Sequence, residues 1–343
     1  MEQIKVFATS GSGYLADGVC AFLKTRLPGE YLIERDQHTV YTFSNENLQV
    51  EIPNVRGAFC VVIHTQVPPV HTNLFELFSL LDAICNSEPD NVLLVFPYMP
   101  YSRSDRKNKP RISTMSVWLA HTINRVCGVK KIILLEPHNE HIKHYFEPQA
   151  QEVSTTYLLA AYLEKTYLQS EDLHKMSKIV YPDAGAASRY GNIAHLLNLG
   201  TAYIDKDRPD NKENPRFNEI IGDVNGFVCF MVDDECLTAK TTIGDAKNLI
   251  EHGAKKVIMI VTHPILNDKN LPSDGVIRKL HDSAICTVIF TNSIPVAHKI
   301  ADKPKFVAIS IDALIAESVK RVILKQSISE LHNMESVKKL DLL

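Results

Sequence analysis

The chain of 343 residues has almost no excess of charge, because 37 Lys and Arg stand against 40 Asp and Glu. A formal net charge of −3 attracts neither nucleic acid nor an anionic membrane over a distance. No apolar run approaches the length of a membrane span. We therefore expect no nucleic acid and no membrane among the partners, and any anion site must be built locally.

The cysteines form no pattern. All seven are scattered, their number is odd, and none is spaced as Cys-x-x-Cys. This usage predicts reduced, mostly buried thiols in a cytoplasmic protein.

Short β-branched runs alternate with longer amphipathic stretches along the chain. The predicted strands are 61–64, 92–96, 131–135, 178–181, 227–232, 256–261 and 287–291, and the predicted helices are 73–85, 114–127, 155–167, 187–198 and 242–252. Near-continuous apolar strands that alternate with helices predict an α/β fold with mostly parallel sheets flanked by helices. Because the pattern occurs twice, we predict domains 1–152 and 153–325, followed by a C-terminal tail, 326–343.

In such folds, ligands bind at the carboxyl ends of the strands. The segment after residue 231 is the most informative of these ends. Its paired acids, Asp233 and Asp234, suit the vicinal hydroxyls of a ribose, and the turn 237–241 then opens a helix whose N-terminus suits a phosphate. Acids that only cap a helix would show the same local pattern.

Several ordered motifs extend this observation from the first strand to about Arg321. They are Phe43-Ser44-Asn45, Pro100-Tyr101-Ser102-Arg103-Ser104-Asp105, His138, Pro182-Asp183-Ala184-Gly185, Lys206 with Arg208, Val232-Asp233-Asp234, Thr262-His263 and Thr291-Asn292-Ser293-Ile294-Pro295. In order and spacing the chain resembles the ribose-phosphate pyrophosphokinase family. The resemblance implies two phosphoribosyltransferase-type domains and transfer of the β,γ-diphosphate of Mg·ATP to the C1 hydroxyl of a ribose phosphate. It also implies a homodimer or homohexamer with Mg²⁺ as cofactor.

The resemblance also implies roles for individual residues. The ATP-binding residues would be Phe43, Asn45, Asn47, Arg103, Ser104 and Asp105; the ribose-phosphate site would be Asp233, Asp234, Leu237, Thr238, Ala239, Lys240 and Thr241; the metal ligands would be His138 and Asp183; the catalytic residues would be Lys206, Arg208 and His138. Phe43 would come from a neighbouring subunit and stack on adenine opposite Arg103.

Some of these residues have plainer interpretations. Phe43 also suits a core aromatic, and the charged segment 205–215 also suits a solvated surface loop. The spacing of His138, His141 and His144 is an alternative zinc pattern, although it is not His-Glu-x-x-His.

The chain departs from the family pattern in the nucleotide motifs, at Asn47, Ser104 and Glu136, and after His263, where Pro264 replaces a glycine. The turn 237–241 departs further, because Leu237 replaces an acid and Lys240 replaces a glycine.

Two acceptors therefore stay open: ribose 5-phosphate, or ADP-ribose giving ADP-ribose pyrophosphate for NAD synthesis, with Lys240 on the second phosphate. A non-catalytic regulatory homologue and a phosphoribosyltransferase are the competing classes.

Overall fold

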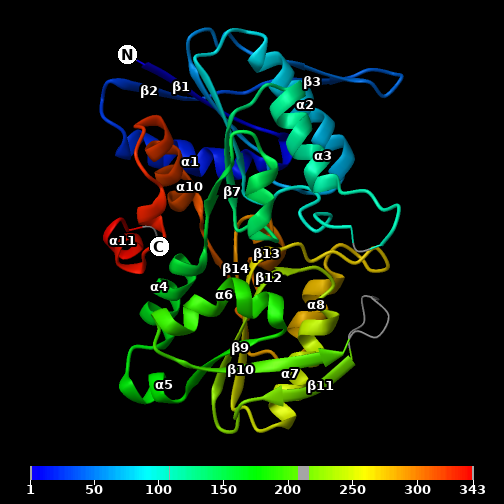
Figure 1. The fold of residues 1–343 in the computed structure, drawn as a ribbon, viewed down its shortest axis with the longest axis vertical. Coiled ribbons are helices and arrows are strands. Elements are labelled where there is room, and N and C mark those ends of the chain that lie inside the picture. The colour runs from blue at the N-terminus through cyan, green and yellow to red at the C-terminus, as the bar shows by residue number, and fades with distance from the viewer. Residues whose placement is uncertain (1, 108, 208–215, 342–343) are drawn as a thin grey trace. The chain divides into compact units, whose positions relative to one another are not determined.

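The computed structural model describes residues 2–107, 109–207 and 216–341. The chain divides into two compact units, each with its own main sheet (Figure 1). Unit 1 comprises residues 1–154, 293–295 and 311–332, and unit 2 comprises residues 155–292, 296–310 and 333–343.

Unit 1 is built on a parallel sheet of six strands. Their order is β2 (Tyr31–Arg35), β1 (Glu2–Ala8), β5 (Phe59–Ile63), β6 (Asn91–Phe96), β7 (Lys131–Leu135) and β8 (Gln151–Val153). The last four residues of β5, β6 and β7 are all buried, so both faces of the sheet are covered. The helices are α1 (Gly13–Arg26), α2 (Val70–Cys85), α3 (Met115–His121) and α10 (Asp312–Ile323), and a separate hairpin is formed by β3 (Thr39–Thr42) and β4 (Leu48–Glu51).

Unit 2 is built on a seven-stranded sheet with one antiparallel edge strand. The order is β11 (Arg216–Ile221), β10 (Gly200–Asp207), β9 (Ser177–Tyr181), β12 (Val228–Cys236), β13 (Lys256–Pro264), β14 (Thr287–Thr291) and β15 (Phe306–Ile309). Only the β10–β11 pair is antiparallel among these described strands. The helices are α4 (Thr156–Tyr167), α5 (Glu171–Lys175), α6 (Ala184–Leu196), α7 (Lys240–Glu251), α8 (Gly275–His281), α9 (Ala297–Ile300) and α11 (Met334–Lys339).

The two sheets repeat one connectivity. In unit 1, β1 lies between β2 and β5, and in unit 2, β9 lies between β10 and β12. The predicted mostly parallel α/β fold is confirmed, because continuous apolar strands need helices on both faces. Within the described residues, no helix is long and apolar enough to cross a membrane.

Three local predictions need correction. Strand β12 extends to Cys236, so the paired acids belong to the last residues of the strand and do not follow it. Asp205–Asp207 belongs to β10 and is not loop, because it pairs with β11. The predicted helix 114–127 is α3, which continues as a π-helical turn at Thr122–Val126.

Candidate functional site

The paired acids of unit 2 stand at the carboxyl end of β12, held in register by β13. Asp234 is buried and forms an ion pair with Arg189 of α6, with Nη1 and Oδ2 2.6 Å apart. The backbone N–H of Asp234 donates to Oδ1 of Asp233 at 2.9 Å. The two carboxyl groups are therefore held beside each other by the strand and by one cation.

The electrostatics of these acids favour a ligand. Burial, and then the carboxylates of Asp234 and Asp183, raise the pKa of Asp233 well above its ordinary value. A carboxylate whose neighbours are also carboxylates is stabilised by a cation or by hydroxyl donors. We call Asp183, Asp233 and Asp234 the carboxylate cluster.

Asp183 is positioned by the start of α6. It is the N-cap, and its Oδ1 accepts a hydrogen bond from the N–H of Ala186 at 2.9 Å. A Cβ at Gly185 would lie 3.2 Å from this oxygen, so the glycine leaves room for the cap. The Asp-x-Gly pattern of this segment thus has a local structural reason as well as a chemical one.

The turn 237–241, the acceptor turn, leads directly into α7. Ala239 is the N-cap of α7 and has a left-handed backbone, with φ +58°, where glycine is the favoured residue. Its side chain is buried, whereas Lys240 and Thr241 are exposed. The turn therefore presents the first N–H groups of a helix beside an accessible lysine, an arrangement that suits an anion.

Lys206 of β10 lies in the same unit. Its Nζ is 2.6 Å from Oδ2 of Asp245 in α7, and the two side chains are 5% and 4% exposed. Arg208, the second predicted loop cation, lies outside the described residues.

The sequence prediction omitted Arg189 and Asp245 as site residues. Each residue has a feature that could have identified it. Arg189 lies within two helical turns after Asp183, on the same helix. Asp245 is an acid on the buried face of α7, next to Ala246.

The predicted adenine residues of unit 1 lie on two elements. Phe43, Asn45 and Asn47 form the turn of the β3–β4 hairpin, where the N–H of Phe43 donates to the carbonyl of Asn47 at 2.9 Å. Phe43 is 52% exposed, so it is not a core aromatic. Among the described residues, the cation–π contacts involve Phe22, Phe59 and Phe227, and not Phe43 with Arg103.

Arg103 lines a cavity of about 280 Å³ in the loop after β6. Ser102 lines it as well, and its Oγ is buried without a hydrogen-bond partner among the described residues. Ser104 has a structural role, because its Oγ accepts from the N–H of Met115 at 3.2 Å as α3 begins. Asp105 is buried and pairs with Arg106. Arg103 is thus the member of this segment best placed to contact a ligand.

His138 is half-buried in unit 1, between β7 and the 3₁₀ helix Glu140–Tyr145. The zinc alternative is not supported, since the ligand atoms of His138, His141 and His144 do not all lie within 4.8 Å of one another. His138 therefore remains the single member of this run with a predicted role.

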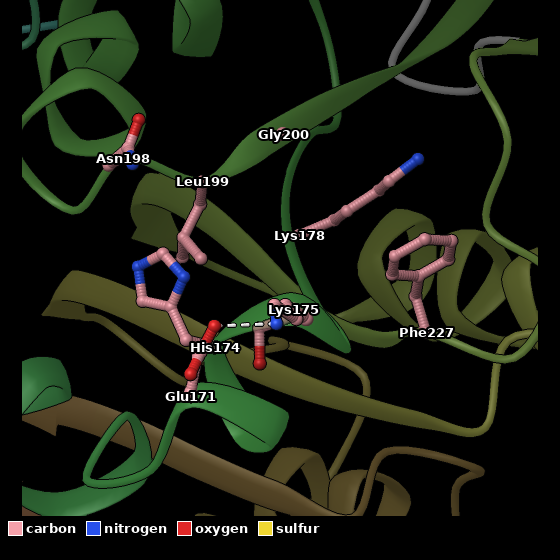
Figure 2. Close-up of a pocket in the computed structure, with 9 residues that line it drawn as sticks. Glu171, His174, Lys175, Lys178, Asn198, Leu199, Gly200 and Phe227 are labelled. Carbon is pink, nitrogen blue, oxygen red and sulfur yellow. Dashed lines mark ion pairs between the residues drawn. The ribbon is translucent and has the colours of Figure 1, made fainter.

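A larger cavity, of about 520 Å³, lies at the amino ends of β9 and β10 in unit 2 (Figure 2). Its polar side chains have internal partners: Lys175 pairs with Glu171, and His174 Nε2 lies 2.6 Å from the carbonyl of Leu197. Lys178 donates to the carbonyl of Asp223 and lies over the ring of Phe227. This cavity is therefore not where the carboxylate cluster and the acceptor turn lie.

Comparison with known proteins agrees with this geometry. Residues 4–126 match the family model described as the N-terminal domain of ribose phosphate pyrophosphokinase, and residues 203–333 match the phosphoribosyl synthetase-associated domain. A ribose-phosphate pyrophosphokinase of Aquifex aeolicus is 30% identical over 332 residues, which cover 96% of this chain and 99% of the relative. This chain belongs to the ribose-phosphate pyrophosphokinase family.

Other members of that family agree. A ribose-phosphate pyrophosphokinase of a Marinomonas species is 33% identical, and the matched residues make up 85% of this chain and 89% of that relative. The solved phosphoribosylpyrophosphate synthetase of Mycobacterium smegmatis superposes with a TM-score of 0.82 at 25% identity, covering 94% of this chain and all of the other. The predicted phosphoribosyltransferase-type fold is confirmed.

Proposed function

We propose that this chain transfers the β,γ-diphosphate of Mg·ATP to the C1 hydroxyl of ribose 5-phosphate, giving AMP and a ribosyl 1-diphosphate. The observation that carries the proposal is the carboxylate cluster at the ends of the neighbouring strands β9 and β12, next to the acceptor turn of unit 2. Carboxylates accept hydrogen bonds from ribose hydroxyls, and the first N–H groups of α7 bind the phosphate of the same sugar. One small site thus matches both ends of a ribose phosphate.

Magnesium fits the residues of this site. Burial, and then the neighbouring carboxylates, raise the pKa of Asp233, and a cation would relieve the repulsion between these carboxylates. Asp183, whose carboxylate is the kind of oxygen ligand that Mg²⁺ prefers, and His138 would hold the ion. When bound, the ion would neutralise charge on the phosphate oxygens.

Catalysis would consist of positioning and charge neutralisation. The C1 oxygen forms a bond to the β-phosphorus, the bond from that phosphorus to the oxygen of the α-phosphate breaks, AMP leaves with that oxygen, and the hydroxyl proton passes to water. Lys206 and Arg208 would place two cations on the triphosphate as charge develops.

The nucleotide would be shared between subunits of a homodimer or homohexamer. Phe43 is exposed at a hairpin tip, and Arg103 is exposed and lines a cavity, so each side chain would contact one face of an adenine. Asn45 and Asn47 would support Phe43, because the amide oxygen of Asn45 accepts from the N–H of Asn47 at 3.2 Å.

ADP-ribose is a second candidate acceptor, favoured by the acceptor turn. Ala239 occupies a left-handed position where glycine would give the closest approach to a phosphate, and Lys240 is exposed beside it. A less enclosing turn with one added cation suits a 5-phosphate that is already esterified.

The test is incubation with Mg·ATP and, separately, ribose 5-phosphate or ADP-ribose, with the nucleotides resolved chromatographically. AMP that appears only with an acceptor supports the proposal and identifies that acceptor. ADP would indicate an ordinary kinase, and no turnover with either acceptor would favour the regulatory homologue.

A further inference from the structure

Strand β10 and helix α7 are joined by a buried ion pair. Nζ of Lys206 donates to Oδ2 of Asp245 at 2.6 Å, and neither side chain is more than 5% exposed. Such a short, charge-assisted hydrogen bond holds the ammonium in one place, whereas an exposed lysine samples many rotamers.

The position of Asp245 shows that this pair is more than a surface contact. Asp245, Ala246 and Leu249 form the buried face of α7. A carboxylate on such a face is costly unless a cation compensates it, and a buried pair adds little net stability compared with apolar residues. The geometry of the pair is thus a more plausible reason for an acid here than stability is.

The hairpin of β10 and β11 also contacts α7 away from the ion pair. The two strands stay paired as far as Asp207, although their register shifts between Asp205 and Lys206, where β11 has one residue more than β10. Phe217 of β11 contacts His252 at the end of α7, with ring centroids 5.9 Å apart. The hairpin is therefore fastened to α7 at two points.

The pair lies near Asp183 of the carboxylate cluster, because Tyr203 of β10 pairs with Tyr181 of β9, and Lys206 and Asp183 follow these two residues by three and two positions. Burial raises the pKa of Asp245, the ammonium of Lys206 lowers it, and the charge of Asp183 contributes a further rise. Asp245 also lies on the helix that follows the acceptor turn, because α7 begins at Lys240, five residues before Asp245. Lys206 is thus tied to the element that would hold the acceptor phosphate.

We propose that Asp245 is a positioning residue, which holds the ammonium of Lys206 at the height of the carboxylate cluster where the triphosphate is to be neutralised. The inference rests on the proposed function, in which Lys206 acts on Mg·ATP. Asp245 touches no substrate in this scheme and acts through Lys206 alone.

The experiment is a double-mutant cycle on AMP formation from Mg·ATP with whichever acceptor is used. Asp245→Asn keeps the shape and removes the charge, and we expect kcat to fall about tenfold to a hundredfold because the lysine is misplaced. The KM for ATP should change little, because the lost interaction belongs to the transition state. In a Lys206→Met background, Asp245→Asn should cause no further loss.

The matched control is Glu251→Gln, which removes the partner of Lys247 from an exposed ion pair of the same helix. It should leave kcat unchanged. If Asp245→Asn does not give a folded protein by circular dichroism, Asp245→Glu replaces it in both backgrounds. It keeps the charge but moves the carboxylate by one methylene, so kcat should still fall, and only where Lys206 is present.

The outcomes separate the inference from the function on which it rests. Near-normal kcat for Asp245→Asn, with Lys206→Met strongly impaired, overturns the positioning role and leaves the proposed function standing. An equal loss in both backgrounds also overturns it, since Asp245 would then act independently of the lysine. Full activity of Lys206→Met would instead remove Lys206 from the proposed function, and the inference with it.

Discussion

Strand β5 of unit 1 and strand β12 of unit 2 have equivalent positions, because each pairs with the first strand of its unit in chain order, β1 or β9, and with the next parallel strand, β6 or β13. The side chains at their carboxyl ends nevertheless differ in charge. After β5 come His64 and Thr65, and at the end of β12 stand Asp233 and Asp234. The same connectivity therefore ends in neutral groups in one unit and in acids in the other.

In unit 1 the polar groups satisfy one another. His64 Nδ1 and Thr9 Oγ1 share a hydrogen bond of 2.8 Å, and burial lowers the pKa of His64 to about 4, so the ring is neutral. The N–H of Thr65 donates to Oγ of Ser12 at 2.8 Å, and its hydroxyl donates to the carbonyl of Ser293 at 2.6 Å. These groups need no ligand.

In unit 2 the carboxylate cluster concentrates like charges, with Arg189 as the cation on Asp234. Like charges in one place cost free energy in the absence of a ligand and are typical of functional sites. The comparison teaches that two units can share one sheet connectivity while, among the described residues, only unit 2 gathers acids at this strand end.

The largest expected effect concerns the cations of unit 2. Lys206→Ala and Arg208→Ala should each lower kcat about a thousandfold if they stabilise the transition state, with nucleotide affinity little changed. Steady-state AMP formation measures both. The control is Lys5→Met in unit 1, which breaks the buried pair with Asp36 (2.7 Å) and should lower stability but not kcat. Near-normal AMP production by the Lys206→Ala, Arg208→Ala double variant contradicts the assignment.

The metal prediction compares a residue that follows β9 of unit 2 with a residue that follows β1 of unit 1. Asp183→Asn after β9 should lower activity at least about tenfold, because an amide is a poorer Mg²⁺ ligand than a carboxylate, and excess Mg²⁺ should restore part of it. Thr9→Val after β1 should affect stability alone. Activity that survives EDTA would refute the metal requirement.

The acceptor turn should decide which ribose derivative is used. Leu237→Asp combined with Lys240→Gly restores an acid and a glycine, so kcat/KM should shift about tenfold toward ribose 5-phosphate and away from ADP-ribose. Parallel kinetics with both acceptors measure the shift. Efficient use of ribose 5-phosphate by the unmodified protein, with no use of ADP-ribose, would leave the ordinary acceptor in place.

Unit 1 should contribute to the nucleotide site only through its surface. Phe43→Ala and Arg103→Ala should each raise the KM for ATP about threefold to tenfold, since each removes one face of the adenine. Mixing the two variants should regenerate some intact sites if the faces come from different subunits. No recovery, once subunit exchange is demonstrated, argues for a site within one chain.

The smallest effect concerns the backbone of the acceptor turn. Ala239→Gly removes the strain of a left-handed alanine at φ +58° but raises the conformational entropy of the unfolded chain. The free energy of unfolding should therefore rise by only about 0.5 kcal/mol. Urea denaturation measures it. Ala246→Gly within α7 should instead lower stability by about 1 kcal/mol or more, because its φ is helical and its side chain is buried. A loss of stability for Ala239→Gly would show that the turn is not strained.

The sequence by itself determined seven strands of the two sheets, which are β5, β6, β7, β9, β12, β13 and β14, and the order of the motifs. Runs such as 92–96 and 256–261 have apolar residues on both faces of the strand. This pattern is typical of a parallel sheet that has helices on both of its faces. It also placed the acids of β12 at a strand end, although the predicted strand 227–232 ended four residues before β12 does. Local pattern sufficed there because each signal lies within one element.

Only the tertiary structure decided which charges meet. Lys206 and Asp245 are 39 residues apart, and Arg189 of α6 pairs with Asp234 of β12, so no local spacing predicts either pair. The pairs depend on the order of β10, β9 and β12 in the sheet and on which face of α7 is buried. A charge that looks solvated in the sequence becomes a fixed, buried group because packing removes its water and leaves one partner within reach.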